Sequence, residues 1–217
     1  MTIAEMRALL DLGDEYTDAQ VVERYAIYLG ATSATPSATV PPITVQMAKE
    51  QLKLDSDGDE DALIERYIAA AVDMVEGITG YVLSRRQLVE SADRFGQFGM
   101  SIQLRAWPIV SVDAISYRNA AGEAALATGA FFAMAGARPA RVYPTTRWPS
   151  DALSGPGLIA ITVTAGFDGP EDVPAAVIQA LLVMVAEFYR NREAGKLSAD
   201  AERSVRRLLR RHIRKVL

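Results

Sequence analysis

The sequence of 217 residues has no cysteine and only one histidine, His212. Without cysteine there is no disulfide bond, no thiolate nucleophile and no cysteine-ligated zinc site. His212 stands among arginines with no nucleophile motif, so a Ser-His-Asp triad is not indicated. No Lys-Ser or Lys-Thr pair follows Gly155-Pro156-Gly157, which argues against a phosphate-binding loop. We predict a protein that is not an enzyme and that uses no cofactor.

Long apolar runs are also absent. The longest one, Leu181 to Ala186, is far shorter than the ~20 residues that cross a bilayer. Glu5 comes early, and no long apolar core precedes a cleavage site, so we expect no signal peptide. The expected compartment is the cytosol, with no membrane partner. Half of the residues are apolar, which is enough for a substantial core.

The charge of the chain is unevenly distributed, although its net value is only −4. Residues 1–80 carry 15 acidic and 5 basic side chains, and residues 81–195 carry 10 of each. Residues 196–217 carry 8 basic and 2 acidic side chains. This polarity favours electrostatic contacts at the two ends of the chain, including contacts between copies of it.

A helix over residues 59–76 is the clearest predicted element. Acidic residues occupy its first turn, and Gly80 supplies a left-handed residue to end it. One face is apolar at helical spacing and comprises Leu63, Ile64, Tyr67, Ile68, Ala71, Val72 and Val75. Further helices are predicted over residues 44–54, capped by Thr44, and over residues 174–194, which begin at Pro174. This last helix is apolar on nearly every side, so we expect it to be buried.

The N-terminal segment resembles the 59–76 region at a shift of 42 positions. Val21-Val22-Glu23-Arg24-Tyr25 corresponds to Leu63-Ile64-Glu65-Arg66-Tyr67, and Leu10-Asp11-Leu12 corresponds to Leu52-Lys53-Leu54. A duplicated helix–turn–helix and a chance recurrence both remain open. We predict a helical extension over residues 1–30, with Thr17 as a cap. Residues 31–42 are rich in Ala, Thr, Ser and Pro, which is typical of a flexible or extended linker.

Residues 86–165 are predicted to form a β-region of five or six strands in one sheet. The clearest strand is 111–117, where polar and apolar residues alternate, and a hairpin-like turn follows at 119–122. The other strands are expected at 87–90, 101–104, 131–134, 141–143 and 158–164. The fold class is therefore α+β: a mainly α-helical bundle with an inserted small antiparallel β-domain and a C-terminal amphipathic basic helix.

The C-terminal tail, residues 196–217, combines an apolar stripe with a row of arginines. Such a helix can neutralise phosphates, lie on an anionic membrane, dock in a groove of another protein, or pack on its own core. We favour docking on a partner protein. The residues predicted to make this contact are Arg203, Val205, Arg206, Arg207, Leu208, Leu209, Arg210, Arg211, Ile213 and Arg214.

The acidic stretch Asp55-Ser56-Asp57-Gly58-Asp59-Glu60-Asp61 resembles a calcium loop at first sight. Its register fails, because a loop begun at Asp55 needs glycine where Glu60 stands and glutamate where Arg66 stands. A turn followed by an acidic helix start explains the stretch, so we predict no metal site.

Residues 43–195 resemble the tailed-bacteriophage head–tail connector family, whose members are also called adaptor or head-completion proteins. The resemblance is carried by short landmarks in a fixed order: Ile43-Thr44, Leu52-Lys53-Leu54, Asp59-Glu60-Asp61-Ala62-Leu63-Ile64, Ala69-Ala70-Ala71, Thr79-Gly80, Trp107-Pro108-Ile109, Trp148-Pro149, Ala165-Gly166, Val173-Pro174 and Tyr189-Arg190-Asn191-Arg192-Glu193. Residues 1–40 lie outside the matched part.

The resemblance implies a protein of the virion neck that assembles in the host cytoplasm. Members form a twelve-fold homo-oligomeric ring under the portal protein, extend the DNA channel without sequence-specific binding, and dock the stopper or tail-completion protein. Their C-terminal segment reaches toward the portal. The charged face of the 59–76 helix then becomes a predicted subunit contact or channel lining, with residues Asp61, Glu65, Asp73 and Glu76. The competing hypotheses are a DNA-binding packaging or regulatory factor that acts through the basic tail, and an enzyme that uses carboxylates and a metal.

Overall fold

The computed structural model describes residues 4, 33–35, 40–54, 58–96, 100–191 and 197–213. The chain forms two compact units. One unit, here called the strand unit, contains residues 1–37 and 86–165. The other, the helical unit, contains residues 38–85 and 166–217, so residues 86–165 of the strand unit are inserted in sequence between its two halves.

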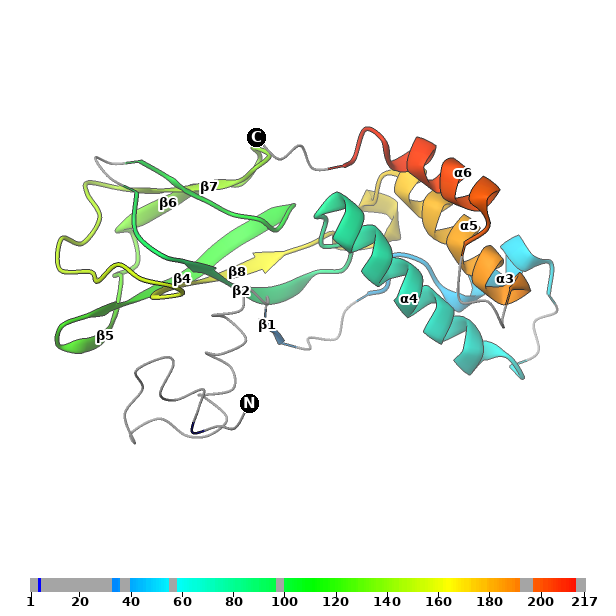
Figure 1. The fold of residues 1–217 in the computed structure, drawn as a ribbon, viewed down its shortest axis with the longest axis horizontal. Helices are drawn as coiled ribbons and strands as arrows, with labels where there is room; N and C mark the ends of the chain where they lie inside the picture. Colours follow the sequence, from blue (N-terminus) through cyan, green and yellow to red (C-terminus); the bar gives the residue numbers. More distant parts are fainter. Residues whose placement is uncertain are drawn as a thin grey trace. The chain divides into compact units, whose positions relative to one another are not determined.

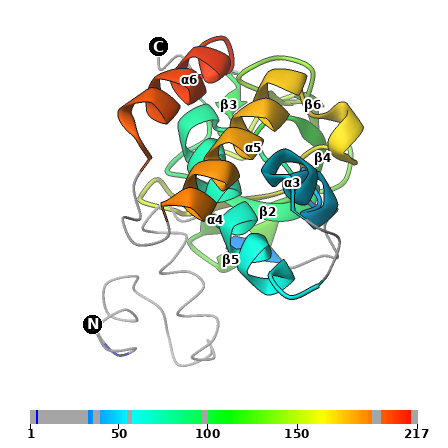
Figure 2. The same ribbon diagram turned by 90° about the vertical axis from the view of Figure 1, so that its right-hand side faces the viewer.

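Four α-helices make up the described part of the helical unit: α3 (Val45–Leu52), α4 (Asp61–Thr79), α5 (Ala175–Arg190) and α6 (Ala199–Leu209). Helix α5 lies at the centre, with α4 packed on one side of it and α6 on another (Figures 1 and 2). Its central position explains why it is apolar nearly all round. Val177, Ala180, Leu181 and Met184 of α5 have no exposed surface.

Local sequence signals set the ends of these helices. The Thr44 hydroxyl accepts a hydrogen bond from the Met47 N–H at 3.2 Å and so caps α3. Gly80, with a φ of 70°, ends α4 as expected. The helix starts at Asp61 and ends at Thr79, whereas the sequence predicted residues 59–76, because Gly77 stays helical and only Gly80 leaves the helix.

The strand unit contains two antiparallel sheets. The five-stranded sheet has the order β1 (Ser33–Thr35), β2 (Arg86–Ala92), β8 (Ile159–Ala165), β4 (Ile109–Asn119) and β5 (Gly122–Ala125). The three-stranded sheet has the order β3 (Ile102–Gln103), β7 (Arg141–Pro144) and β6 (Phe131–Met134). Alternate residues of the central strand β8 are buried, namely Ile159, Ile161, Val163 and Ala165.

The strand positions agree closely with the sequence, but the prediction of a single sheet is wrong. The tight turn at residues 119–122 joins β4 to β5, and Gly122 takes a φ of 126° there. β3, β7 and β6 pair among themselves, a separation that strand periodicity cannot reveal. β1 lies within the range predicted as a linker and pairs with β2. The predicted helical extension over residues 1–30 falls outside the described residues, except for Ala4.

Candidate interaction surface

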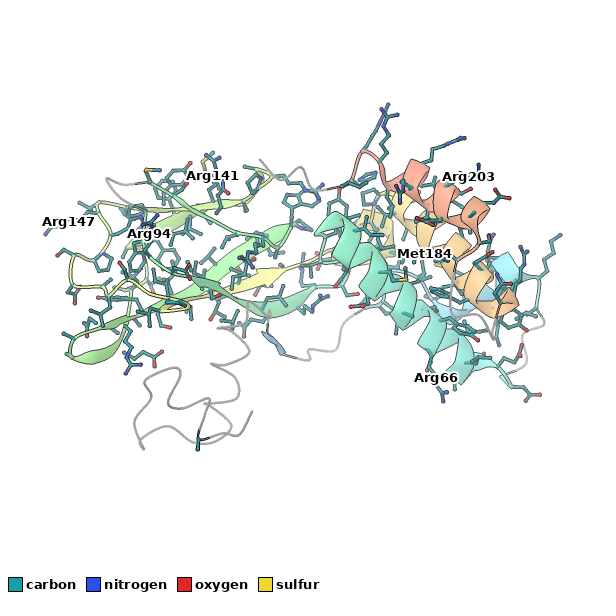
Figure 3. All side chains as sticks on the ribbon, viewed as in Figure 1. Arg66, Arg94, Arg141, Arg147, Met184 and Arg203 are labelled. Atoms are coloured by element: carbon teal, nitrogen blue, oxygen red, sulfur yellow. The ribbon has the colours of Figure 1, made fainter. Side chains whose placement is uncertain are left out.

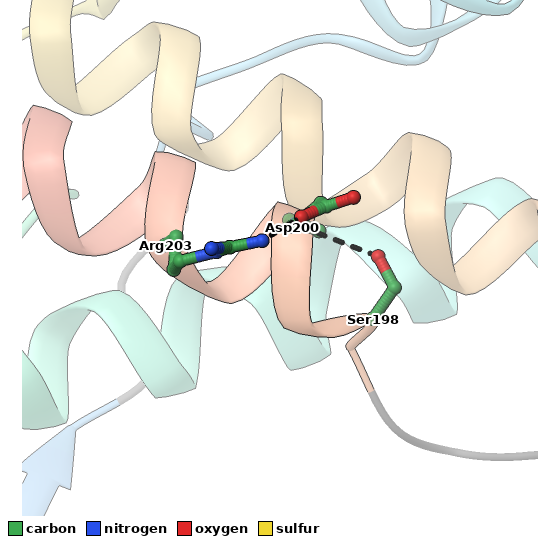
Figure 4. A network of polar contacts seen from close by, with 4 residues as sticks. Ser198, Asp200 and Arg203 are labelled. Atoms are coloured by element: carbon green, nitrogen blue, oxygen red, sulfur yellow. Dashed lines mark hydrogen bonds and ion pairs between the residues drawn. The ribbon is translucent and has the colours of Figure 1, made fainter.

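Helix α6 carries most of the predicted docking residues. Ser198 caps its start, because the Ser198 hydroxyl accepts a hydrogen bond from the Ala201 N–H at 3.3 Å (Figure 4). Asp200 and Glu202 follow in the first turn, where the helix dipole favours acidic residues. Arginines fill the rest of the exposed face, so the helix is acidic at its start and basic toward its end.

The connection from α5 holds the start of α6 in place. The Glu187 carboxylate of α5 accepts hydrogen bonds from the Ser198 N–H at 2.9 Å and from Asn191 Nδ2 at 2.8 Å. Hydrogen bonding by Ser198 is the main cause that lowers the pKa of Glu187, and it outweighs burial, which acts to raise the pKa. Arg190 and Asn191 lower the pKa by smaller amounts. The ionised carboxylate therefore ties the first residue of the basic helix to the central helix.

The apolar stripe of α6 faces the protein's own core. Ala201, Val205 and Leu209 are buried, and α6 packs directly against α5. Val205 and Leu209, both predicted to dock on a partner, thus already have intramolecular neighbours. This arrangement corresponds to the alternative in which the tail packs on its own core, and it leaves the arginine face as the exposed surface of the folded helix.

The single histidine also fixes the tail. His212 Nδ1 lies 2.8 Å from the Tyr81 hydroxyl, and the two rings meet edge to face with centroids 5.7 Å apart. Tyr81 follows the end of α4, and its ring also contacts Phe167 with centroids 5.9 Å apart. His212 therefore links the end of the basic helix to the body of the helical unit and has a structural role.

A groove opens among α4, α5 and α6, with a volume of about 650 Å³. Most of the residues that line it are apolar, and three of them are unusually exposed for their type: Met74 at 41%, Ile78 at 42% and Ile213 at 40%. Met184 of α5, labelled in Figure 3, is fully buried and belongs to this lining. The complete lining consists of Met74, Ile78, Met184, Phe188, Leu197, Glu202, Val205, Arg206, Leu209 and Ile213.

The arginines of the tail differ in their partners. Arg203 pairs with Asp200, as Figure 4 shows, and Arg206 pairs with Glu202 at 2.9 Å. Arg207, Arg210 and Arg211 are exposed and make no ion pair within the described part of the chain. These three guanidinium groups, one on α6 and two in the turn that follows it, are the positive charges of this face that no acidic neighbour pairs within that part of the chain. Arg214 lies outside the described residues.

The four acidic residues predicted on α4 divide into two pairs. Asp61 Oδ1 lies 2.5 Å from Nζ of the buried Lys49 of α3, and Glu76 Oε1 accepts the Leu83 N–H at 2.7 Å. Glu65 and Asp73 are exposed to solvent. Asp61 and Glu76 therefore hold the helical unit together internally, and Glu65 and Asp73 remain available for contacts with other molecules.

The carboxylates of the strand unit serve its internal structure. Glu90 is buried on β2 and accepts the backbone N–H groups of Arg105 and Ala106, each with a closest distance of 2.7 Å. Burial alone would raise the pKa of Asp113, but hydrogen bonds from Ser111, Thr164 and Gln87 outweigh it and lower the pKa. These bonds join β4 to β8 and β2, so Asp113 has a role in pairing the strands.

Neither a metal cluster nor a membrane-crossing helix is found in the described ranges. No three His, Asp or Glu side chains within them are grouped so as to hold a metal ion. None of the helices there has the length and apolar character needed to cross a bilayer. Asp55 and Asp57 of the acidic stretch lie outside these ranges.

Several features of this surface have no clear signal in the sequence. Met74 and Ile78 lie beside the predicted apolar face of α4, but only the packing of α6 reveals that they line a groove. Glu187 and Tyr81 belong to no motif and become important through distant partners, Ser198 and His212. The Ser198 cap itself was detectable, since serine preceding an acidic turn is a helix-start signal.

Comparison with solved structures identifies the fold. A chain in the neck of an empty gene transfer agent particle, computed with C6 symmetry, superimposes with a TM-score of 0.67 and 23% sequence identity. A chain in the neck of the native particle, computed with C12 symmetry, superimposes with a TM-score of 0.66 and 24% sequence identity. Each match covers 86% of this chain and 96% of the other chain. At these identities the likeness establishes a shared fold.

Comparison with protein families is more specific. Curated proteins give no match. The sequence model of one family, described as phage gp6-like head–tail connector protein, matches residues 42–119, which run from the start of α3 through α4 and β2 to the end of β4. This range includes the first of the landmarks that carry the sequence resemblance, from Ile43-Thr44 to Trp107-Pro108-Ile109. Over residues 42–119 the chain is therefore similar to phage gp6-like head–tail connector proteins.

Proposed function

We propose that this protein is a head–tail connector in the neck of a tailed phage or a related particle. In this proposal, copies of the chain form a ring under the portal protein, extend the channel for DNA, and provide a platform for the stopper or tail-completion protein. The observation that carries the proposal is the family match over residues 42–119. The shared fold over 86% of the chain with proteins from gene transfer agent necks supports it.

The distribution of charge suits a closed ring. A cyclic assembly needs two different surfaces on each subunit that meet head to tail. Glu65 and Asp73 are exposed on α4, as are Arg207 on α6 and Arg210 and Arg211 in the turn that follows α6. Opposite charges on different helices favour the correct partner and orientation when subunits meet. A twelve-fold ring is the expected form, given the resemblance of the chain to connectors.

The arginine face of α6 is the proposed contact with the portal. Because Val205 and Leu209 are buried against the helical unit, the folded helix offers its arginines and not its apolar stripe. Guanidinium groups bind carboxylates through paired hydrogen bonds, so an acidic surface on the portal is the matching partner. This revises the expected docking mode while keeping the same segment.

The protein would act through its geometry, without a catalytic step. DNA that passes through a channel must not be held tightly, and acidic or neutral walls avoid binding its phosphates. The exposed Glu65 and Asp73 are suitable for such a wall or for a contact between subunits. Asp61 and Glu76 have internal partners and are less suited to either role.

The proposal is tested by mixing the purified chain with its portal and measuring complex formation by native mass spectrometry and negative-stain imaging. We expect the full chain to add a ring to the portal and a chain that ends at Lys196 not to do so. Truncation also uncovers the surface on α5 that Val205 and Leu209 cover, so a second variant is needed.

Arg207→Glu combined with Arg211→Glu reverses charge on α6 and on the turn that follows it, and both positions are exposed. Arg147→Glu, at an exposed position of the strand unit, is the matched control. We expect the double variant to lose portal binding and the control to retain it. Equal binding by full chain, truncated chain and double variant would show that the tail is not the portal contact. No binding by the full chain would contradict the connector proposal itself.

A second candidate function is suggested by the same arginines. Arg207, Arg210 and Arg211 could neutralise phosphates of a DNA duplex, as a packaging or regulatory factor would. This function predicts duplex binding that weakens steeply with salt, with a slope that falls when Arg207 and Arg211 are replaced. Undetectable binding at low salt would eliminate it.

A further inference from the structure

We propose that the three-stranded sheet of the strand unit binds an extended acidic segment of a partner protein, which adds as a fourth strand beside β6. The contact surface consists of the open edge of β6 and the outer face of the sheet, formed by Gln103, Phe132, Met134, Arg141 and Tyr143. The inference goes beyond the proposed connector function, because it assigns a partner to a surface that the portal contact on α6 does not use.

One edge of β6 has no neighbouring strand within the described ranges. β6 is the last strand in the order β3, β7 and β6 (Figure 1). The Thr145 N–H donates to the Ala130 carbonyl oxygen at 2.9 Å, so every second residue from Ala130 onward bonds to β7. The backbone N–H and C=O groups of Phe131 and Ala133 therefore point to the open edge.

This edge lacks the features that usually prevent strand pairing. Natural edge strands are commonly protected by a charged side chain, a proline or a bulge. β6 has the sequence Phe131-Phe132-Ala133-Met134, and its register with β7 is regular. Such an edge is a template for strand addition, in which main-chain hydrogen bonds hold an extended peptide.

The side chains beside the edge form an exposed apolar patch. The register pairs Phe132 with Tyr143, and the two rings stack with centroids 5.5 Å apart. Met134 lies opposite Arg141 on the same face of the sheet. Phe132 is 52% exposed and Met134 is 50% exposed, and neighbouring exposed apolar side chains mark interaction sites. Aromatic residues, methionine and arginine are also the types enriched at protein interfaces.

The charge of this sheet is positive. Residues 100–110 and 126–149, which include its three strands, carry four arginines and no aspartate or glutamate. Arg141 is exposed, and hydrogen bonding by its side chain is the main cause that lowers the pKa of Tyr143. The guanidinium group thus lies beside the aromatic pair, where it can bind a carboxylate through paired hydrogen bonds. The preferred occupant is therefore an extended segment with both apolar and acidic residues.

Two other occupants match the surface less well. Pairing of β6 with β6 of a second copy would bring the Arg141 side chains of both copies onto one joint sheet that has no acidic residue. Duplex DNA would neutralise the arginine but would not cover the exposed apolar side chains with apolar atoms. The stacked rings of Phe132 and Tyr143 also cover one face of each other, which leaves less area for stacking of bases.

Binding is measured by fluorescence anisotropy with the full chain and a labelled ten-residue peptide that alternates glutamate and valine. A peptide that alternates lysine and valine is the matched control for charge. We expect the acidic peptide to bind at least ten times more tightly than the basic one. Arg141→Glu should weaken binding of the acidic peptide at least tenfold, and Arg66→Glu, at an exposed position of α4, should leave it unchanged.

A proline at the open edge tests the strand addition itself. Ala133→Pro removes an N–H group that points away from β7, so the ladder between β6 and β7 keeps its hydrogen bonds. We expect this variant to bind the acidic peptide at least ten times more weakly. Tryptophan fluorescence monitors its folding, because Trp107 and Trp148 both belong to the strand unit.

A modified peptide gives the same test without any change in the protein. An acidic peptide that is N-methylated at every residue keeps its side chains but has no N–H group to donate to the Phe131 and Ala133 carbonyl oxygens. We expect it to bind at least ten times more weakly than the unmodified peptide.

Several results would overturn the inference. No binding of the acidic peptide at about 1 mM, or equal binding of the unmodified and the N-methylated peptide, would show that β6 accepts no strand. Self-association of the chain that Ala133→Pro abolishes would show that the occupant is a second copy. Binding of a DNA duplex that Arg141→Glu abolishes and Phe132→Ser leaves unchanged would show that the face contacts nucleic acid instead.

Discussion

Replacement of Ile64 by alanine should greatly destabilise the helical unit. Ile64 lies on the face of α4 that packs toward α5, and none of its surface is exposed. The change removes three carbon groups from a packed interior. At about 0.8 kcal/mol for each buried carbon, the lost transfer free energy is about 2.4 kcal/mol. The cavity that remains adds to this cost, so we expect a loss of about 3 kcal/mol in the free energy of unfolding.

Helical circular dichroism is the appropriate signal, because all four described helices belong to the helical unit. Both tryptophans, Trp107 and Trp148, belong to the strand unit, so their fluorescence monitors that unit separately. Urea unfolding should show a lower midpoint for Ile64→Ala in the helical signal.

The matched control is Glu65→Ala, which changes the next residue at an exposed position and should alter stability by no more than about 0.5 kcal/mol. By the same reasoning Ile64→Asp should unfold the helical unit, and Glu65→Lys should leave the fold intact. A loss below about 1 kcal/mol for Ile64→Ala, or equal losses for both alanine variants, would show that α4 is not packed as described.

Three further predictions concern the residues that hold α6 and the strands in place. Gly166→Ala should lower the free energy of unfolding by at least about 2 kcal/mol, because Gly166 has a φ of 113° and an added Cβ would lie 2.6 Å from the Ser84 carbonyl oxygen. Denaturant unfolding measures this loss, and an unchanged stability would contradict the geometry. Glu187 has a pKa below its ordinary value of 4.5, so its hydrogen bond to Ser198 should stabilise the fold above pH 4.5 and lose this effect as the pH falls through the lowered pKa. Glu187→Gln should therefore remove this part of the pH dependence of the free energy of unfolding. An unchanged pH profile in the variant would show that the bond contributes nothing. Tyr81→Phe should lower the free energy of unfolding by about 1 kcal/mol, because it removes the hydroxyl contact with His212 and leaves the contact between the two rings. No change in the unfolding midpoint would show that the hydroxyl contact is not maintained in solution.

The helices and most of the strands could be predicted from the sequence because their signals are local. Thr44 and Gly80 act on neighbouring backbone groups, and the apolar spacing of α4 follows from helix geometry alone. Pro174 likewise marks the start of α5 through its own fixed backbone angle. The family resemblance was drawn over residues 43–195, and the family model covers the first part of that range, residues 42–119.

The features that were missed depend on contacts between distant residues. Strand alternation shows which residues face a core but not which strands pair, so the division into two sheets was not foreseen. The stripe of Val205 and Leu209 on α6 is equally suited to a partner's groove and to the chain's own core, and only packing distinguishes them. The apolar groove arises from residues on three helices, and its lining is therefore invisible in any one segment.

The most direct test of the connector proposal is electron microscopy of the full chain mixed with purified portal rings. The account predicts an additional ring of density, coaxial with the portal, that encloses an open channel and is absent when the chain is omitted. Portal rings that remain bare at saturating concentrations of the folded chain would contradict it.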